Sequence, residues 1–233
     1  MTPPAGPGAD GCPGGWIVVR EADGRVVAER VADAAGLVAV AREVAALGVD
    51  IPIGLAEDGP RACDRAVRAL LGPGRASSVF PAPVRAVLDA VDYAGACARS
   101  LAACGRKLTL QTWHITARIR DVDTALRDGP QLARRIHEVH PEASFHLWSG
   151  GAGLPRKKTR EGRSARLALV EARWPGAWAE ARAAHRKALV RDDDLLDAFA
   201  ALWSARRIAA GTALRLPAAV MHDAHGLPMV IQA

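Results

Sequence analysis

The first part of the chain alternates between β-rich and helical patterns. Residues 16–30 contain two runs rich in β-branched side chains, WIVVR and RVVAER, separated by EADG, which is a strong hairpin-turn signal. Residues 33–47 space their leucines and valines as one face of a helix does. The apolar run at 49–55 then predicts a buried strand. This order indicates an α/β sheet of mixed strand direction.

Helical patterns dominate the rest of the chain. Residues 56–130 are mostly helical, and a second buried strand is predicted at 135–140. Three further helices are predicted near 164–173, 176–189 and 194–210. Because no linker or internal repeat separates the parts, we predict one domain, 1–233, with a helical insertion at about 56–130 between the two buried strands.

Composition excludes several classes of protein. Half of the 233 residues are apolar and 24% are charged, as in proteins with a sizeable core. No apolar run approaches the roughly 20 residues of a membrane helix, and the first residues lack the pattern of a secretory signal. The four cysteines form no CxxC pair, which argues against a zinc finger and favours reduced thiols in a cytoplasmic protein. The net charge of +6 permits a polyanionic partner.

Acidic residues lie at the ends of the predicted strands. Asp10 begins the tight-turn sequence DGCPGGW, and Asp50 lies inside the apolar run VDIPIG. A carboxylate in a buried strand is costly unless it is paired or binds a cation. Asp50 could instead cap a neighbouring helix or turn, because Asp fills such positions readily.

Two later clusters add further acids. Glu138 and Glu142 belong to EVHPE, where one could face solvent and the other could begin a helix. Asp194 and Asp197 lie in RDDDLLDAFAALWSA, three residues apart and therefore on one face of a helix. Capping explains the first aspartates of this run well, but it explains Asp197 poorly because that residue lies a turn inside the helix.

Together these acids suit a divalent cation. Like charges brought together are tolerated when a cation intervenes, and hard oxygen ligands select Mg²⁺ or Mn²⁺. Two such ions, roughly 3.5–4 Å apart, can activate water and stabilise the leaving oxygen in phosphodiester cleavage.

A basic segment fits the same chemistry. The stretch PRKKTREGRSAR carries Lys157, Lys158, Arg163 and Arg166, which are candidate contacts to a nucleic-acid backbone. Trp148, beside a glycine-rich loop, could stack on a base. The alternative for the basic segment is a solvated loop that runs into a charged helix face.

Seven motifs in order resemble a known family. They are DGCPGGW, DIPIGL with RACDRAVRALLG, SSVFPAP, EVHPEASF, KKT…GR…R, DDLLDAFAALWSA and GLPMVI. They resemble an uncharacterised bacterial and archaeal family whose members are described as predicted RNase H-like nucleases. The resemblance spans residues 10–231.

The resemblance implies an RNase H-like fold. This is a five-stranded, hairpin-led mixed sheet, with the helical insertion between the fourth and fifth strands. It also implies metal ligation by the first-strand acid, a central-strand acid and acids of the last helix. In this sequence they are Asp10, Asp50, Asp194 and Asp197, with Glu138 or Glu142 as a further candidate. One departure is the first strand, where Pro7 and Gly8 replace apolar residues and weaken the ladder.

Three hypotheses about function follow. The first is a nuclease that hydrolyses phosphodiester bonds with Mg²⁺ or Mn²⁺, with Asp10, Asp50, Glu138, Asp194 and Asp197 in its active site. The second is a non-catalytic nucleic-acid-binding or scaffold protein with the same fold. The third is an enzyme acting on a small phosphorylated ligand, which ranks last because the chain lacks a suitable glycine-rich phosphate loop.

Overall fold

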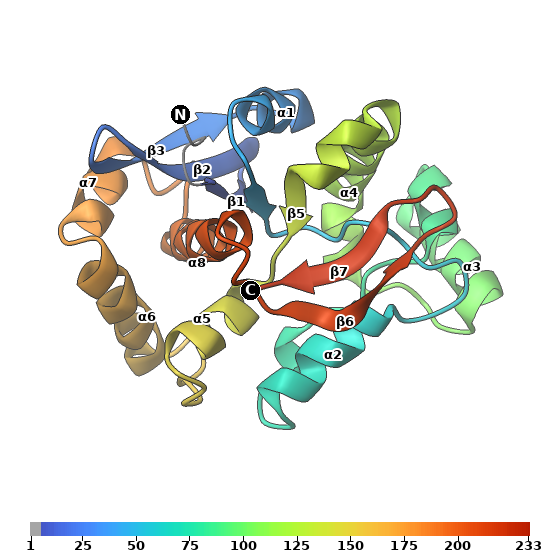
Figure 1. Cartoon of the computed structure of the whole chain (residues 1–233). Coiled ribbons are helices and arrows are strands. Elements are labelled where there is room, and N and C mark those ends of the chain that lie inside the picture. Colours follow the sequence, from blue (N-terminus) through green and yellow to red (C-terminus); the bar gives the residue numbers. More distant parts are fainter. Residues whose placement is uncertain (1–5) are drawn as a thin grey trace. The chain divides into compact units, whose positions relative to one another are not determined.

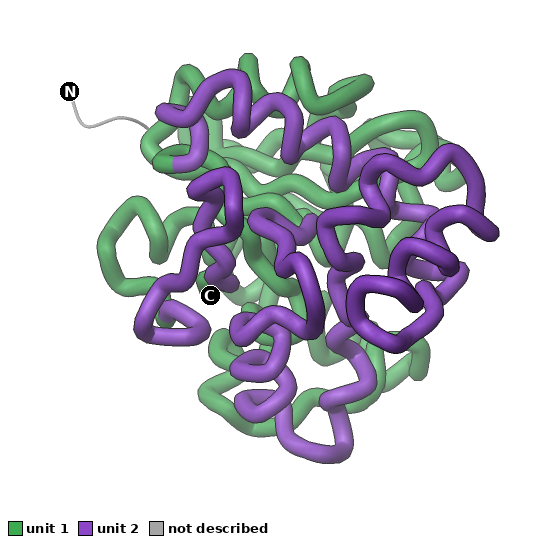
Figure 2. The backbone as a smooth tube through the Cα atoms, turned by 90° about the vertical axis from the view of Figure 1, so that its right-hand side faces the viewer, with its two compact units in different colours: residues 1–50, 134–214, 232–233 green, residues 51–133, 215–231 purple. Residues whose placement is uncertain are grey.

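The chain forms two compact units. The computed structural model describes residues 6–233 (Figure 1). Unit 1 comprises the described residues up to 50, residues 134–214 and residues 232–233, and unit 2 comprises 51–133 and 215–231 (Figure 2). The segment predicted as a helical insertion in a single domain therefore lies in unit 2, together with most of the C-terminal hairpin.

A five-stranded mixed sheet forms the centre of unit 1. Its order is β3-β2-β1-β4-β5, with β1, β2 and β3 successively antiparallel and β1, β4 and β5 parallel. The strands are β1 (Gly8–Cys12), β2 (Gly15–Ala22), β3 (Arg25–Val31), β4 (Leu47–Val49) and β5 (Ile136–Glu138). The predicted α/β class with a mixed sheet is confirmed, and the helical segment does lie between the fourth and fifth strands.

Helix α8 is the central helix of unit 1. It packs against β1, β2 and β4, and helices α5, α6 and α7 pack around it (Figure 1). Three aspartates in its first turn and two arginines in its last turn suit the helix dipole. Its apolar side chains form one core with the sheet, in which Ile17, Phe199 and Leu202 are fully buried. The helices of unit 1 are α1 (Ala34–Arg42), α5 (Pro141–Trp148), α6 (Arg160–Arg173), α7 (Ala177–Ala184) and α8 (Asp192–Ala209).

Close approach of α8 explains the unusual composition of β1. A Cβ atom on Gly8 would lie 1.9 Å from the backbone nitrogen of Leu202 and 2.4 Å from the carbonyl oxygen of Ala198. Gly8 therefore allows the helix backbone to rest directly on the strand. The strand forms in spite of Pro7 and Gly8, with β2 on one side and β4 on the other.

We expect Gly8→Ala to lower the free energy of unfolding by about 1–3 kcal/mol, because the helix backbone must move away to admit a methyl group. Urea denaturation followed by circular dichroism measures the change. Gly153→Ala is the matched control, since a Cβ atom there meets nothing within 4 Å. Equal midpoints for the two variants would contradict the close contact between β1 and α8.

The strand predicted at 49–55 is largely wrong, because β4 spans Leu47–Val49 and shares only Val49 with the predicted run. The preceding helix α1 ends at Arg42 and not at the predicted 47. Strand β4 ends at Val49, and the chain then turns through Gly54, whose φ is +69°. Pro52 has no N–H group to extend the ladder, and this accounts for the early end. The result places Asp50 at the end of a strand.

Unit 2 is mainly helical and carries a β-hairpin. Helix α2 packs on the first strand of that hairpin, and helices α3 and α4 pack on a short 3-10 helix, η2. The elements are α2 (Ala62–Leu71), η1 (Ala76–Ser78), η2 (Arg85–Asp89), α3 (Tyr93–Cys104), α4 (Leu110–Asp128), η3 (Pro130–Arg134, which ends in unit 1), β6 (Arg215–His222) and β7 (Pro228–Gln232, whose last residue belongs to unit 1).

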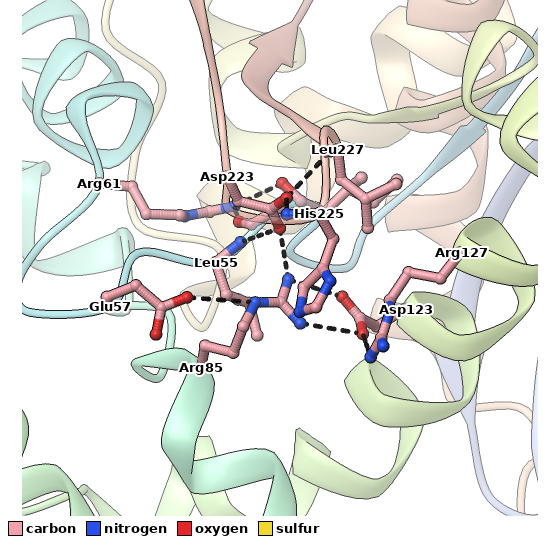
Figure 3. Close-up of polar contacts among 11 residues, drawn as sticks. Leu55, Glu57, Arg61, Arg85, Asp123, Arg127, Asp223, His225 and Leu227 are labelled. Atoms are coloured by element: carbon pink, nitrogen blue, oxygen red, sulfur yellow. Dashed lines mark hydrogen bonds and ion pairs between the residues drawn. The ribbon is translucent and has the colours of Figure 1, made fainter.

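A network of charged groups centred on Arg85 holds unit 2 together (Figure 3). Arg85 donates to both carboxylate oxygens of Asp123 on α4 (2.9 and 3.1 Å) and to Asp223 in the hairpin turn. Burial opposes ionisation of Asp223, but hydrogen bonds from the N–H groups of Leu227, Leu55 and His225, with the charge of Arg85, lower its pKa. Because each carboxylate is satisfied by protein donors, we interpret the network as structural.

Candidate functional site

Strand register brings Asp10 and Asp50 together. Strands β1 and β4 are parallel neighbours with Ala9 opposite Val49, so the two aspartates follow at the same level of the sheet. The Asp50 N–H donates to the Ala9 carbonyl at 3.0 Å, which fixes this level. Side chains at equal levels of adjacent strands point to the same face.

Helix α8 adds a third carboxylate. Burial raises the pKa of Asp50 to about 8, and the negative charge of Asp197 adds to this rise while Lys157 opposes it. Burial also raises the pKa of Asp10, with further contributions from the charges of Asp50 and Asp197. Three of the predicted site residues, Asp10, Asp50 and Asp197, therefore lie near one another in unit 1. We call these three residues the acidic cluster.

Lys157 is the cation of this cluster. Its Nζ donates to Asp197 Oδ2 at 2.9 Å. The charge of Asp197 raises the pKa of the Lys157 ammonium in spite of partial burial, and the charges of Asp50 and Asp10 contribute further. Burial raises the pKa of Asp197, whereas Lys157 lowers it. The sequence predicted Lys157 as a contact to nucleic acid, but in the structure its ammonium binds a carboxylate of the site.

Glu142 is held by an arginine. The guanidinium of Arg166 donates to both Glu142 carboxylate oxygens at 2.9 Å, and the residues are 1% and 6% exposed. Arg166, predicted as a phosphate contact, is thus buried inside unit 1 and not offered to a ligand at the surface. Glu142, predicted as a metal ligand, has both oxygens engaged by a cation.

The remaining two predicted acids have different surroundings. Glu138 is buried at the end of β5, and its charge contributes to the raised pKa of Asp50. Asp194 accepts a hydrogen bond from the backbone N–H of Arg191 at 2.9 Å, as in one half of a capping box. Burial raises the pKa of Asp194, while the Arg191 N–H lowers it. Helix capping was the alternative interpretation that the sequence offered for the first aspartates of RDDDLLDAFAALWSA.

Two of the predicted phosphate contacts are at the surface. Lys158 is exposed, and Arg163 is about half exposed with its guanidinium 3.7 Å from Asp192 and 3.8 Å from Asp193. Trp148 is packed against Phe145, Trp174 and Trp203, with ring centroids 5.5–5.8 Å apart. This packing makes Trp148 part of the aromatic core of unit 1 rather than a free platform for a base.

The donor chemistry of the acidic cluster suits a hard divalent ion. Within the part of the chain that the structure describes, Asp50 accepts no hydrogen bond and Asp10 accepts only one, from the Gly11 N–H at 2.7 Å. Among residues 6–233, no three His, Cys, Asp or Glu side chains are arranged as a ready-made metal site. Mg²⁺ is commonly held by one or two carboxylates together with water and substrate oxygens. Asp10 and Asp50 fit that pattern as a pair.

Two ion pairs were not predicted from the sequence. The partners Lys157 and Asp197 are 40 residues apart, and Glu142 and Arg166 are 24 apart. No local spacing signals either pair. The excess of basic residues between 155 and 166 was visible, but their partners depend on how α6 packs beside α8 and α5.

These features define an α/β protein with a partly buried acidic cluster beside a lysine. The profile of a family described as "Protein of unknown function (DUF429)" matches residues 8–222, and the chain belongs to this family. No curated protein and no solved structure matches the chain. None of the helices in residues 6–233 combines the length and hydrophobicity needed to cross a lipid bilayer.

Proposed function

We propose that this protein is an RNase H-like nuclease that hydrolyses phosphodiester bonds of nucleic acid with Mg²⁺ or Mn²⁺. The observation that carries the proposal is the meeting of Asp10, Asp50 and Asp197 from two parallel strands and the last helix. The sheet order β3-β2-β1-β4-β5, opened by a hairpin, supports it because the RNase H-like resemblance implies such a sheet.

In this proposal each residue of the site has a separate role. Asp10 and Asp50 would hold a divalent ion, since their oxygens have few protein donors. When bound, such an ion supplies positive charge that polarises a phosphodiester. Lys157 donates a hydrogen bond directly to Asp197 and so opposes the rise that burial causes in the pKa of Asp197. Lys158 and Arg163, at the surface of the same segment, would contact the phosphate backbone.

A cleavage assay tests this proposal. Labelled single-stranded and double-stranded DNA, the corresponding RNA and a DNA–RNA hybrid are incubated with the protein in Mg²⁺, Mn²⁺ or EDTA. We expect cleavage of at least one substrate with metal, none with EDTA, and none by Asp10→Asn. Asp23→Asn is the matched control, because Asp23 is exposed in the β2–β3 turn and asparagine tolerates its positive φ of 51°. Full activity in EDTA, or in Asp10→Asn, would contradict the proposal.

One observation favours a second candidate function. Lys157 already neutralises Asp197, as expected of a protein that binds nucleic acid without cleaving it. This candidate predicts binding that weakens steeply as salt rises, without turnover in any metal. The same substrates, followed by fluorescence anisotropy across a salt series, distinguish it from the nuclease.

A further inference from the structure

The backbone on both sides of Lys157 is anchored by hydrogen bonds, and its ammonium binds Asp197 of the acidic cluster. The segment before α6 is anchored on both sides of Lys157, because Arg166 donates to the Pro155 carbonyl at 2.9 Å and the Thr159 hydroxyl donates to the Arg156 carbonyl at 3.0 Å. Gly162 allows this fit, since a Cβ atom there would lie 2.0 Å from the Arg156 carbonyl oxygen. These backbone contacts therefore fix the position of Lys157 in the fold.

Three of the other candidate carboxylates, Asp197, Asp194 and Glu142, already have donors. One Asp197 oxygen accepts from Lys157, one Asp194 oxygen accepts from the Arg191 N–H, and both Glu142 oxygens accept from Arg166. A site for two ions needs carboxylates that serve both, with the ions roughly 3.5–4 Å apart. In this protein a lysine holds the carboxylate on α8 that a second ion would need.

We propose that the site takes a single divalent ion, held by Asp10 and Asp50, and that the Lys157 ammonium supplies the second positive charge, on Asp197. The inference rests on the proposed function, because it assigns the cations of the same site. It makes Lys157 a positioning residue for Asp197 rather than a contact to nucleic acid, and it differs from the two-ion arrangement expected from the sequence.

Metal stoichiometry without substrate tests the inference. Calorimetric titration with Mn²⁺ is expected to give one ion per chain for the wild-type protein and for Lys157→Arg, which keeps the charge. Lys157→Met is expected to give two ions per chain, because Asp197 is then released to bind metal. Lys158→Met, at the exposed neighbouring position, is the matched control and should remain at one. Circular dichroism of each variant establishes that it is folded before titration.

The outcomes separate this inference from the nuclease proposal. Two ions in the wild-type protein, or one ion in folded Lys157→Met, would overturn the inference even if metal-dependent cleavage is observed. One ion in the wild-type protein and two in Lys157→Met would support it even if no nucleic acid is cleaved. Absence of any Mn²⁺ binding to the wild-type protein would overturn it as well.

Discussion

The Asp50→Asn variant is expected to be more stable than the wild-type protein at pH 8 in the absence of metal, and to lose metal-dependent cleavage by about 100-fold or more. The gain in stability and the loss of cleavage have the same cause, which is removal of the Asp50 carboxylate. The carboxylate that would hold the ion is costly to ionise when no ion is present.

The stability effect follows from the pKa of Asp50. An exposed aspartate loses its proton near pH 4, whereas burial raises the pKa of Asp50 to about 8 in the folded protein. Between these values the folded state binds more protons than the unfolded state, so the free energy of unfolding falls as pH rises. The stabilisation is complete below about pH 4 and is lost above about pH 8. Asparagine does not ionise, so we expect Asp50→Asn to remove this pH-dependent fall in the free energy of unfolding, which is on the order of a few kcal/mol.

Urea denaturation in EDTA at a series of pH values from acid to pH 8 measures the effect. Asp23→Asn is the control again, because it makes the same chemical change at an exposed position of unit 1. Adding Mn²⁺ at pH 8 should stabilise the wild-type protein and leave Asp50→Asn nearly unchanged. If the free energies of unfolding of the wild-type protein and Asp50→Asn change with pH in parallel, the Asp50 carboxylate is well solvated and the acidic cluster does not exist as described.

The second large effect is expected at Arg166. Replacing Arg166 by Met leaves the Glu142 carboxylate buried without its bidentate partner, and breaking a buried pair in this way typically costs about 3–5 kcal/mol. We expect a corresponding fall in the free energy of unfolding, measured by urea denaturation near neutral pH.

A double variant distinguishes the pair from simple loss of packing. Arg166→Met with Glu142→Leu removes both charges, and it should recover most of the lost stability because no unpaired carboxylate remains. Arg160→Met, at an exposed position at the start of α6, controls for the loss of an arginine from the same helix. A double variant as unstable as Arg166→Met would show that Glu142 is not the source of the cost.

Much of the fold could be predicted from local patterns. The hairpin of β2 and β3 and the helices α2, α3 and α4 follow from turn residues, spacing and glycine stops within each segment. Helix α1 was predicted too long, since it ends at Arg42, before the stop expected at Gly48. The short helix α5 was considered only as the alternative in which one glutamate of EVHPE begins a helix, because EVHPEASF reads as a strand followed by a proline stop. The long buried run after Gly48 was assigned as strand for too many residues, since Pro52 interrupts it.

Of the candidate site, only the acidic residues could be predicted from the sequence. Asp50 and Asp197 were candidates because a carboxylate beside apolar residues is unusual, and Asp10 was a candidate because it begins a tight turn; both signals are local. The donors that engage the other acids come from distant segments, so the sequence could not distinguish a carboxylate available to an ion from one held by an arginine. The role of Lys157 was missed for the same reason.

The paired glycines under α8 also govern the acidic cluster. Gly8 and Gly48 are opposite each other in β1 and β4, and a Cβ atom on Gly48 would lie 2.8 Å from the Ala201 carbonyl oxygen. Asp10 and Asp50 each follow one of these glycines by two residues, and Asp197 precedes Ala201 by about one helical turn. The absence of two side chains thus sets the gap between helix and sheet, and with it how closely the Asp197 carboxylate approaches those of Asp10 and Asp50.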